Sequence, residues 1–179
     1  MGASLYVIPV ATLLRQVGTS MDVAFSATFD PDGELAAPTP GAAEVVPGAD
    51  VEVALTLTSY LGGGVAATGT VRAPWRASCR RCASDVGGTL EVRVAERFSP
   101  AAGPDDDEAY PLVAEHVDLA ELVRDAVVLE LPLAPLCRQD CAGLCPVCGA
   151  DRNDADCGCR PVGDPRWATL DALRVPEEA

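Results

Sequence analysis

Residues 51–60 read VEVALTLTSY and residues 65–77 read VAATGTVRAPWRA. In both stretches, apolar residues alternate with polar or small ones, which is typical of strands with one buried face. Gly62, Gly63 and Gly64 supply a turn between them, so the two stretches predict a hairpin. Residues 89–98 alternate in the same way after Gly87 and Gly88, and residues 21–29 do so more roughly. The chain is therefore expected to have a mainly antiparallel β body.

The segment CRRC, residues 79–82, lies at the tip of the hairpin formed by the second and third of these stretches. It contributes two of eight cysteines, which stand at positions 79, 82, 137, 141, 145, 148, 157 and 159. Eight is twice the coordination number of a structural zinc ion. Dense cysteines in a chain without a secretory signal indicate metal binding rather than disulfides.

The strongest local signal is CPVCG, residues 145–149, because two thiolates that flank a tight turn can bind one ion. Cys157 and Cys159, separated by Gly158, form the natural second half of this site. One predicted zinc site is therefore Cys145, Cys148, Cys157 and Cys159. The remaining cysteines form two close pairs and predict a second site, made of Cys79, Cys82, Cys137 and Cys141. Shuffled pairing, a free cysteine, or iron in place of zinc are open alternatives.

Residues 118–130 predict the main helix, with a capping-box pattern at Asp118 and Glu121 and an apolar stripe at helical spacing. Residues 5–16 could form a strand and then a helical turn, a choice that the sequence leaves open. Residues 30–49 and 99–109 fit loops, and a last short helix is expected after Pro165. We expect a β-rich body over residues 1–131 and a C-terminal cysteine-rich zinc module over residues 132–179. The expected class is α+β, with one main helix and a compact C-terminal module that resembles a zinc ribbon.

The chain carries a net charge of −14, and all 13 of its basic residues are arginines. This negative charge argues against a protein that binds nucleic acid with its whole surface. A local basic patch surrounds the first cysteine pair: its candidate nucleic-acid contacts are Arg72, Trp75, Arg76, Arg80 and Arg81. The alternative is that these arginines offset the charge of thiolates and of the acidic loop.

Catalytic patterns are absent from the sequence. His116 is the only histidine, no phosphate-binding glycine loop is present, and neither predicted zinc site leaves a ligand position open. No apolar run approaches the length of a membrane span. We therefore expect a cytoplasmic protein that is not an enzyme and that has neither a small-molecule substrate nor a membrane partner.

The order of these motifs resembles the YceD family, the large ribosomal RNA subunit accumulation proteins of bacteria and plastids. The resemblance rests on residues 79–82, Phe98, the acidic spacer, Asp118-Leu119, Leu131-Pro132, the run from Cys137 to Gly149, and a final DPRW with Leu170. It covers about residues 50 to 173. Where that family often has an Asn-Leu-Asn-like stretch after the CxxC, this chain has residues 150–153, ADRN.

The resemblance implies a ribosome biogenesis factor that supports 23S rRNA accumulation or processing and large-subunit assembly, with the matching cysteines as metal ligands. The expected partners are large-subunit precursor rRNA, a basic ribosomal protein, or both, since the acidic surface complements a basic protein. The rival readings are a zinc-ribbon adaptor between proteins outside the ribosome, and a thiol or iron redox protein.

Overall fold

The computed structural model describes residues 4–30, 33, 35, 43–103, 108–160 and 166. Its elements, in chain order, are β1 (Val7–Pro9), α1 (Ala11–Leu14), β2 (Ser20–Thr28), β3 (Glu44–Val45), β4 (Asp50–Tyr60), β5 (Gly64–Ser78), β6 (Asp85–Ser99), β7 (Tyr110–Val113), β8 (His116–Asp118) and α2 (Leu119–Glu130).

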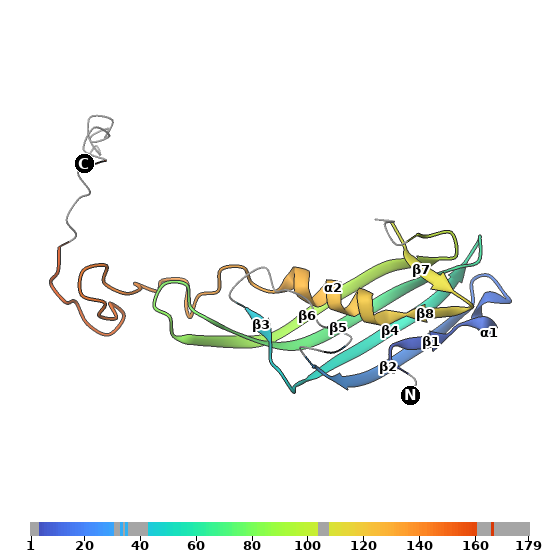
Figure 1. Ribbon diagram of the computed structural model, residues 1–179, viewed down its shortest axis with the longest axis horizontal. Helices are drawn as coiled ribbons and strands as arrows, with labels where there is room; N and C mark the ends of the chain where they lie inside the picture. The colour runs from blue at the N-terminus through green and yellow to red at the C-terminus, as the bar shows by residue number, and fades with distance from the viewer. Residues whose placement is uncertain are drawn as a thin grey trace.

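One curled sheet contains all of these strands, in the order β1-β8-β7-β6-β5-β4-β2 (Figure 1). Outside this order, β3 pairs in antiparallel register with the C-terminal part of β5, at Trp75 and Arg76. The long strands β4, β5 and β6 are neighbours in antiparallel register, with Val53 opposite Val71 and Val71 opposite Val92. β6 and β7 pair in parallel through Phe98 and Tyr110, so the sheet is mixed.

The expected α+β class is wrong. Strands account for 44% of the described residues and helices for 12%. The described part holds two helices, of 4 and 12 residues. The expected loop at residues 30–49 contains the short strand β3, and the short strand β7 follows the expected loop at residues 99–109, where no element was predicted. Runs of two to four residues are too short to show alternation, so the sequence pattern could not reveal them.

The prediction of a C-terminal module that resembles a zinc ribbon is also wrong. After α2, the described residues form a single isolated β-bridge, between Leu144 and Asp151, and no strand. A zinc ribbon would pair strands within one segment, whereas here one cysteine pair belongs to the turn between β5 and β6. Apart from Arg166, the short helix expected after Pro165 lies outside the described residues.

Helix α2 covers the concave face of the sheet (Figure 1). Asp118 is its N-cap and accepts a hydrogen bond from the Ala120 N–H at 2.9 Å, which satisfies an otherwise free amide. Leu119, Leu122 and Val123 are at most 1% exposed and join the side chains of β4 and β5 in the main core. The helix ends at Glu130, and after its C-cap Leu131 the chain leaves the sheet toward the cysteines.

The segment after α2 runs back along the β5–β6 turn. The Arg80 N–H donates to Pro135 O at 2.9 Å, and the Leu144 N–H donates to Arg81 O at 2.9 Å. These bonds place two parts of the chain, more than 50 residues apart, side by side beyond the end of the main core. The turn and the segment that follows α2 together carry every cysteine of the chain.

Candidate metal centres

The first group of sulfur atoms, called here the inner cluster, consists of Cys79, Cys82, Cys137 and Cys141. These four Sγ atoms all lie within 4.8 Å of one another. Cys79 and Cys141 Sγ are 3.8 Å apart, and Cys82 and Cys137 Sγ are 3.6 Å apart. Three of the four side chains are buried in a cluster separate from the main core, against which the partly buried Val86 and Leu136 pack. The inner cluster therefore fastens the β5–β6 turn to the segment that follows α2.

The second group, called here the outer cluster, consists of Cys145, Cys148, Cys157 and Cys159. Its Sγ atoms also lie within 4.8 Å of one another, but only Cys145 is buried. The Val147 N–H donates to Cys145 Sγ at 3.4 Å, as expected where a tight turn wraps around a thiolate. Either group could hold a metal ion, and the outer one faces solvent more openly.

The two CxxC turns have the same backbone geometry. After Cys82, Ala83 has φ +59° and donates its N–H to Cys79 O at 2.8 Å. After Cys148, Gly149 has φ +76° and donates its N–H to Cys145 O at 2.9 Å. In each case the left-handed residue reverses the chain so that both cysteine side chains point to the same side.

Hydrogen bonds and burial shift the pKa values of the thiols within each cluster in opposite directions. The N–H of the second cysteine of each turn is the main cause that lowers the pKa of Cys79 and of Cys145 to about 6. Burial raises the pKa of Cys137 to about 12, and hydrogen bonding to Cys148 raises the pKa of Cys159 to about 12. Each cluster thus holds at least one thiol whose pKa is lowered and at least one whose pKa is raised, and a thiol of the second kind keeps its proton until a metal ion displaces it.

The spacing of the sulfur atoms fits a tetrahedral ion. Metal–sulfur bonds of ~2.3 Å at tetrahedral angles place the sulfur atoms about 3.8 Å apart. Two pairs in the inner cluster, at 3.6 and 3.8 Å, match that separation. Four thiolates and no open position are typical of a structural site, not a catalytic one.

Two side chains that hydrogen-bond Cys141 could not be given this role from the sequence: Arg81 lies in the CxxC turn of the inner cluster, and Asn153 reaches it from the loop of the outer cluster. Arg81 donates to Cys141 O at 2.8 Å, and the Asn153 amide donates to Cys141 Sγ at 3.4 Å. Neither residue is a ligand, and no spacing rule points to them. For Asn153, the only hint was the polar stretch at residues 150–153, which follows the CxxC directly, and Arg81 was expected only as a member of the basic patch.

The structure separates the residues of the expected basic patch. Arg72 forms an ion pair with Glu91, and Arg76 forms an ion pair with Glu44. Alternation along β5 places both arginines on the face opposite to Trp75, so the three side chains do not form one surface.

The other two arginines of the expected patch lie in the β5–β6 turn. The Arg81 guanidinium is held by the backbone carbonyls of Gln139 and Cys141. Arg80 is exposed, and its side chain has no hydrogen bond or ion pair to any residue that the structure describes. Arg80 is therefore the patch member whose charge is most available to a partner.

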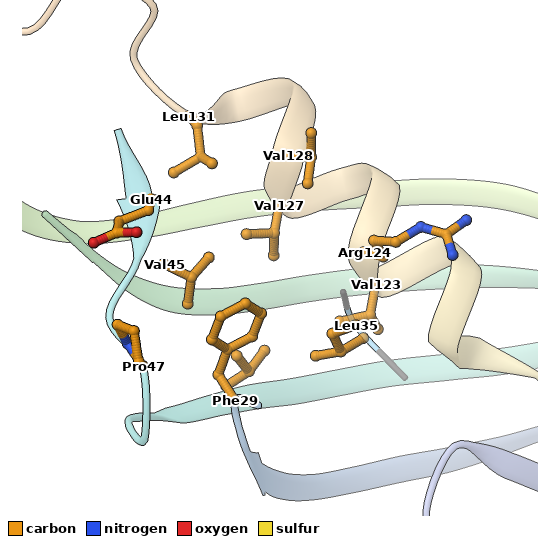
Figure 2. Close-up of a pocket in the computed structure, with 11 residues that line it drawn as sticks. Phe29, Leu35, Glu44, Val45, Pro47, Val123, Arg124, Val127, Val128 and Leu131 are labelled. Atoms are coloured by element: carbon orange, nitrogen blue, oxygen red, sulfur yellow. The ribbon is translucent and has the colours of Figure 1, made fainter. Parts of the chain in front are cut away.

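An apolar pocket of about 130 Å³ lies between α2 and strands β3 and β4 (Figure 2). Phe29, Val45 and Val127 point into it. The charged residues at its rim are already paired, Glu44 with Arg76 and Arg124 with Glu121. The pocket therefore offers apolar packing space but no arrangement of reactive groups.

Comparison with protein families matches residues 67–174 to YceD, described as large ribosomal RNA subunit accumulation protein. The matched region includes both cysteine clusters and α2. None of the described helices has the length and apolar character that a membrane crossing requires.

Relatives fall into two groups. An uncharacterised protein of Mycobacterium tuberculosis strain H37Rv is 43% identical over 119 residues, which cover 64% of this chain and 58% of that protein. One from Mycobacterium leprae is 33% identical over 135 residues, 73% of this chain and 62% of its own length. A maize protein named large ribosomal RNA subunit accumulation protein YCED homolog 1, chloroplastic, is 36% identical over 58 residues, 32% of this chain and 20% of that protein.

The chain thus spans less than two thirds of the length of the mycobacterial relatives that it matches. No solved structure gives a significant match.

Proposed function

This chain belongs to the YceD family of large ribosomal RNA subunit accumulation proteins, and we propose that it is a non-enzymatic factor that supports 23S rRNA accumulation and assembly of the large ribosomal subunit. The single observation that carries this proposal is the family match over residues 67–174, which includes both cysteine clusters. The plant relatives named for this role support it. We place the activity in the cytoplasm.

We propose zinc as the resident metal, held by the inner and the outer cluster. Four thiolates at these separations suit a tetrahedral ion that prefers sulfur. When bound, zinc supplies a rigid cross-link and no reactive position. In the inner cluster, Cys79 and Cys82 tie the sheet to the segment that follows α2, so this ion fixes where the C-terminal residues stand. We also propose that the chain divides into a β-rich body over residues 1–131 and a metal-binding C-terminal part over residues 132–179.

The surface we propose for contact with precursor rRNA is centred on Arg80, at the outside of the inner cluster. Arg72 and Arg76 extend it along β5, because their ion pairs are exposed and such pairs are worth only ~0.2–1 kcal/mol. An RNA phosphate can displace a carboxylate partner at this small energetic cost. Arg81 would support the turn through its bonds to the carbonyls of Gln139 and Cys141, whereas Trp75 lies on the other face of β5, outside this surface. The acidic remainder of the chain suits a basic ribosomal protein.

Depletion of the protein from cells tests the function. We expect the 23S to 16S rRNA ratio to fall and immature large subunits to accumulate on sucrose gradients. Wild-type protein should restore both, and a Cys82→Ser/Cys141→Ser variant should not. A normal rRNA ratio and normal particles after depletion would contradict the ribosomal role, but would not contradict the proposed metal sites.

Binding of the purified, metal-loaded protein to 23S fragments tests the contact surface. Arg80→Gln should weaken binding and reduce the dependence on salt by the equivalent of about one phosphate contact. Arg15→Gln is the matched control, since it makes the same charge change at an exposed site far from the clusters. Equal losses from both variants would mean that only net charge matters.

A protein–protein adaptor outside the ribosome is the second candidate. The observation that favours it is the pair of exposed apolar side chains Leu144 and Val147, which are 42% and 57% exposed on the outer cluster. The adaptor predicts co-purification with another machine, such as polymerase, and unchanged rRNA. An iron or thiol redox protein would be coloured or would cycle its thiols, so a colourless protein with zinc-protected thiols dismisses it.

A further inference from the structure

Asn153 belongs to one cluster by sequence and contacts the other in space. It lies in the loop between Cys148 and Cys157, two residues of the outer cluster. Its side-chain N–H nevertheless donates to Sγ of Cys141, a residue of the inner cluster, at 3.4 Å. It is the only asparagine of the chain.

The amide of Asn153 is held in one orientation. Its Oδ1 accepts hydrogen bonds from the Ala142 N–H and from the Arg138 guanidinium, both at 2.8 Å. Its Nδ2 also donates to Asp151 Oδ1 at 2.6 Å. Because donors occupy the oxygen, the nitrogen is the atom that faces the sulfur of Cys141, so a flip would lose several hydrogen bonds.

Backbone contacts make this position depend on how the outer loop closes. The Cys145 N–H donates to Ala150 O at 2.8 Å, and the Arg152 N–H donates to Gly143 O at 2.9 Å. Both bonds run between the segment entering the outer cluster and the loop that carries Asn153. Gly143 cannot be replaced freely, since a Cβ there would lie 2.9 Å from Arg81 O.

We propose that Asn153 is a positioning residue that couples the two metal sites, so that metal at the outer cluster strengthens metal retention at the inner cluster. Metal bound to Cys148 and Cys157 closes the loop, and the closed loop presents the Asn153 amide to the Cys141 thiolate. An N–H donor offsets part of the negative charge that four thiolates leave around a divalent ion. By linkage, metal at the inner cluster must strengthen the outer site equally. This inference rests on the proposed metal binding.

The test uses four full-length proteins loaded with cobalt, whose thiolate absorption reports each bound ion. They are the wild type, Asn153→Ala, a variant with the outer cluster removed (Cys148→Ser/Cys159→Ser), and the combination of the two. We expect Asn153→Ala to speed chelator-driven loss of inner-site cobalt about tenfold when the outer cluster is intact. In the variant without the outer cluster, the same substitution should change little.

Gln139→Ala is the matched control, because it removes an exposed amide from the same segment, where only the backbone carbonyl of Gln139 is used. It should leave cobalt loss unchanged. A second readout needs no cluster variant: cobalt titration of the metal-free chain should be cooperative in the wild type and not in Asn153→Ala.

Equal effects of Asn153→Ala with and without the outer cluster would overturn the coupling, and so would independent filling of the two sites in the wild type. A wild-type protein that binds no metal would instead overturn the proposed zinc sites themselves. The two failures are therefore distinguishable.

Discussion

Ala83 and Gly149 occupy the same structural position in two separate CxxC turns, although they are 66 residues apart in sequence. Each has a positive φ and donates its N–H to the carbonyl of the first cysteine of its turn. One turn uses glycine there and the other uses alanine, for which this conformation costs ~1–2 kcal/mol. The two turns therefore allow the effect of alanine and of glycine at this left-handed position to be compared within one protein.

We expect Gly149→Ala to weaken metal binding at the outer cluster by about 1 kcal/mol, because a left-handed backbone disfavours a Cβ. No atom lies within 4 Å of the added Cβ, so the effect is one of conformation alone. Ala83→Gly should strengthen the inner cluster by up to ~1 kcal/mol. Chelator competition at each cluster measures both. Equal affinities for all variants would show that the turn conformation is not needed for binding.

Metal removal should loosen the cysteine-rich segment and leave the sheet folded. The inner cluster and its apolar neighbours are separate from the main core, so the core side chains do not depend on the metal. In hydrogen exchange, a chelator should remove protection from the Leu144 amide, which bonds Arg81 O, and leave the Leu55 amide protected. Loss of protection at both amides would show that metal is required for the whole fold.

Stability should fall as pH rises from about 10 to about 12 because of Tyr110. Burial, and then the charge of Asp125, raise its pKa from 10.0 to about 12. Over that range the unfolded chain loses the phenol proton while the folded protein keeps it, so deprotonation favours unfolding. Denaturant unfolding at several pH values measures the decline, which Tyr110→Phe should reduce. Asp125→Asn should give an intermediate slope, and an unchanged slope in Tyr110→Phe would contradict the assignment.

Gly69→Ala should destabilise the sheet more than Gly62→Ala. Both glycines have a positive φ, of +151° and +98°, so both substitutions strain the backbone. At position 69 the new Cβ would also lie 2.2 Å from Ala54 O, whereas at position 62 it meets nothing within 4 Å. We expect an additional cost of about 1–3 kcal/mol for Gly69→Ala, measured by thermal or denaturant unfolding. Equal costs would mean that β5 shifts freely to make room.

The long strands were predictable because alternation over ten or more residues is a strong signal. Residues 51–60 and 65–77 were expected as strands, and β4 and β5 extend at most one residue beyond them at each end. The fold class was not predictable, since β3, β7 and β8 are too short to show an alternating pattern. These short strands form because they pair with neighbouring strands of the sheet. For the same reason the sequence left residues 5–16 undecided, where the structure has β1 followed by α1.

At the metal centres, the sequence by itself determined the eight thiols and their close pairs, because cysteines two to four residues apart can reach one ion whatever surrounds them. Only the tertiary structure decided which distant pairs meet: Cys79 faces Cys141 because the segment after α2 runs back along the β5–β6 turn. It also decided that Arg81 and Asn153 serve the clusters, whereas Arg72 and Trp75 point to opposite faces of the sheet. Contacts of this kind depend on the path of the whole chain through space, and local spacing carries no information about that path.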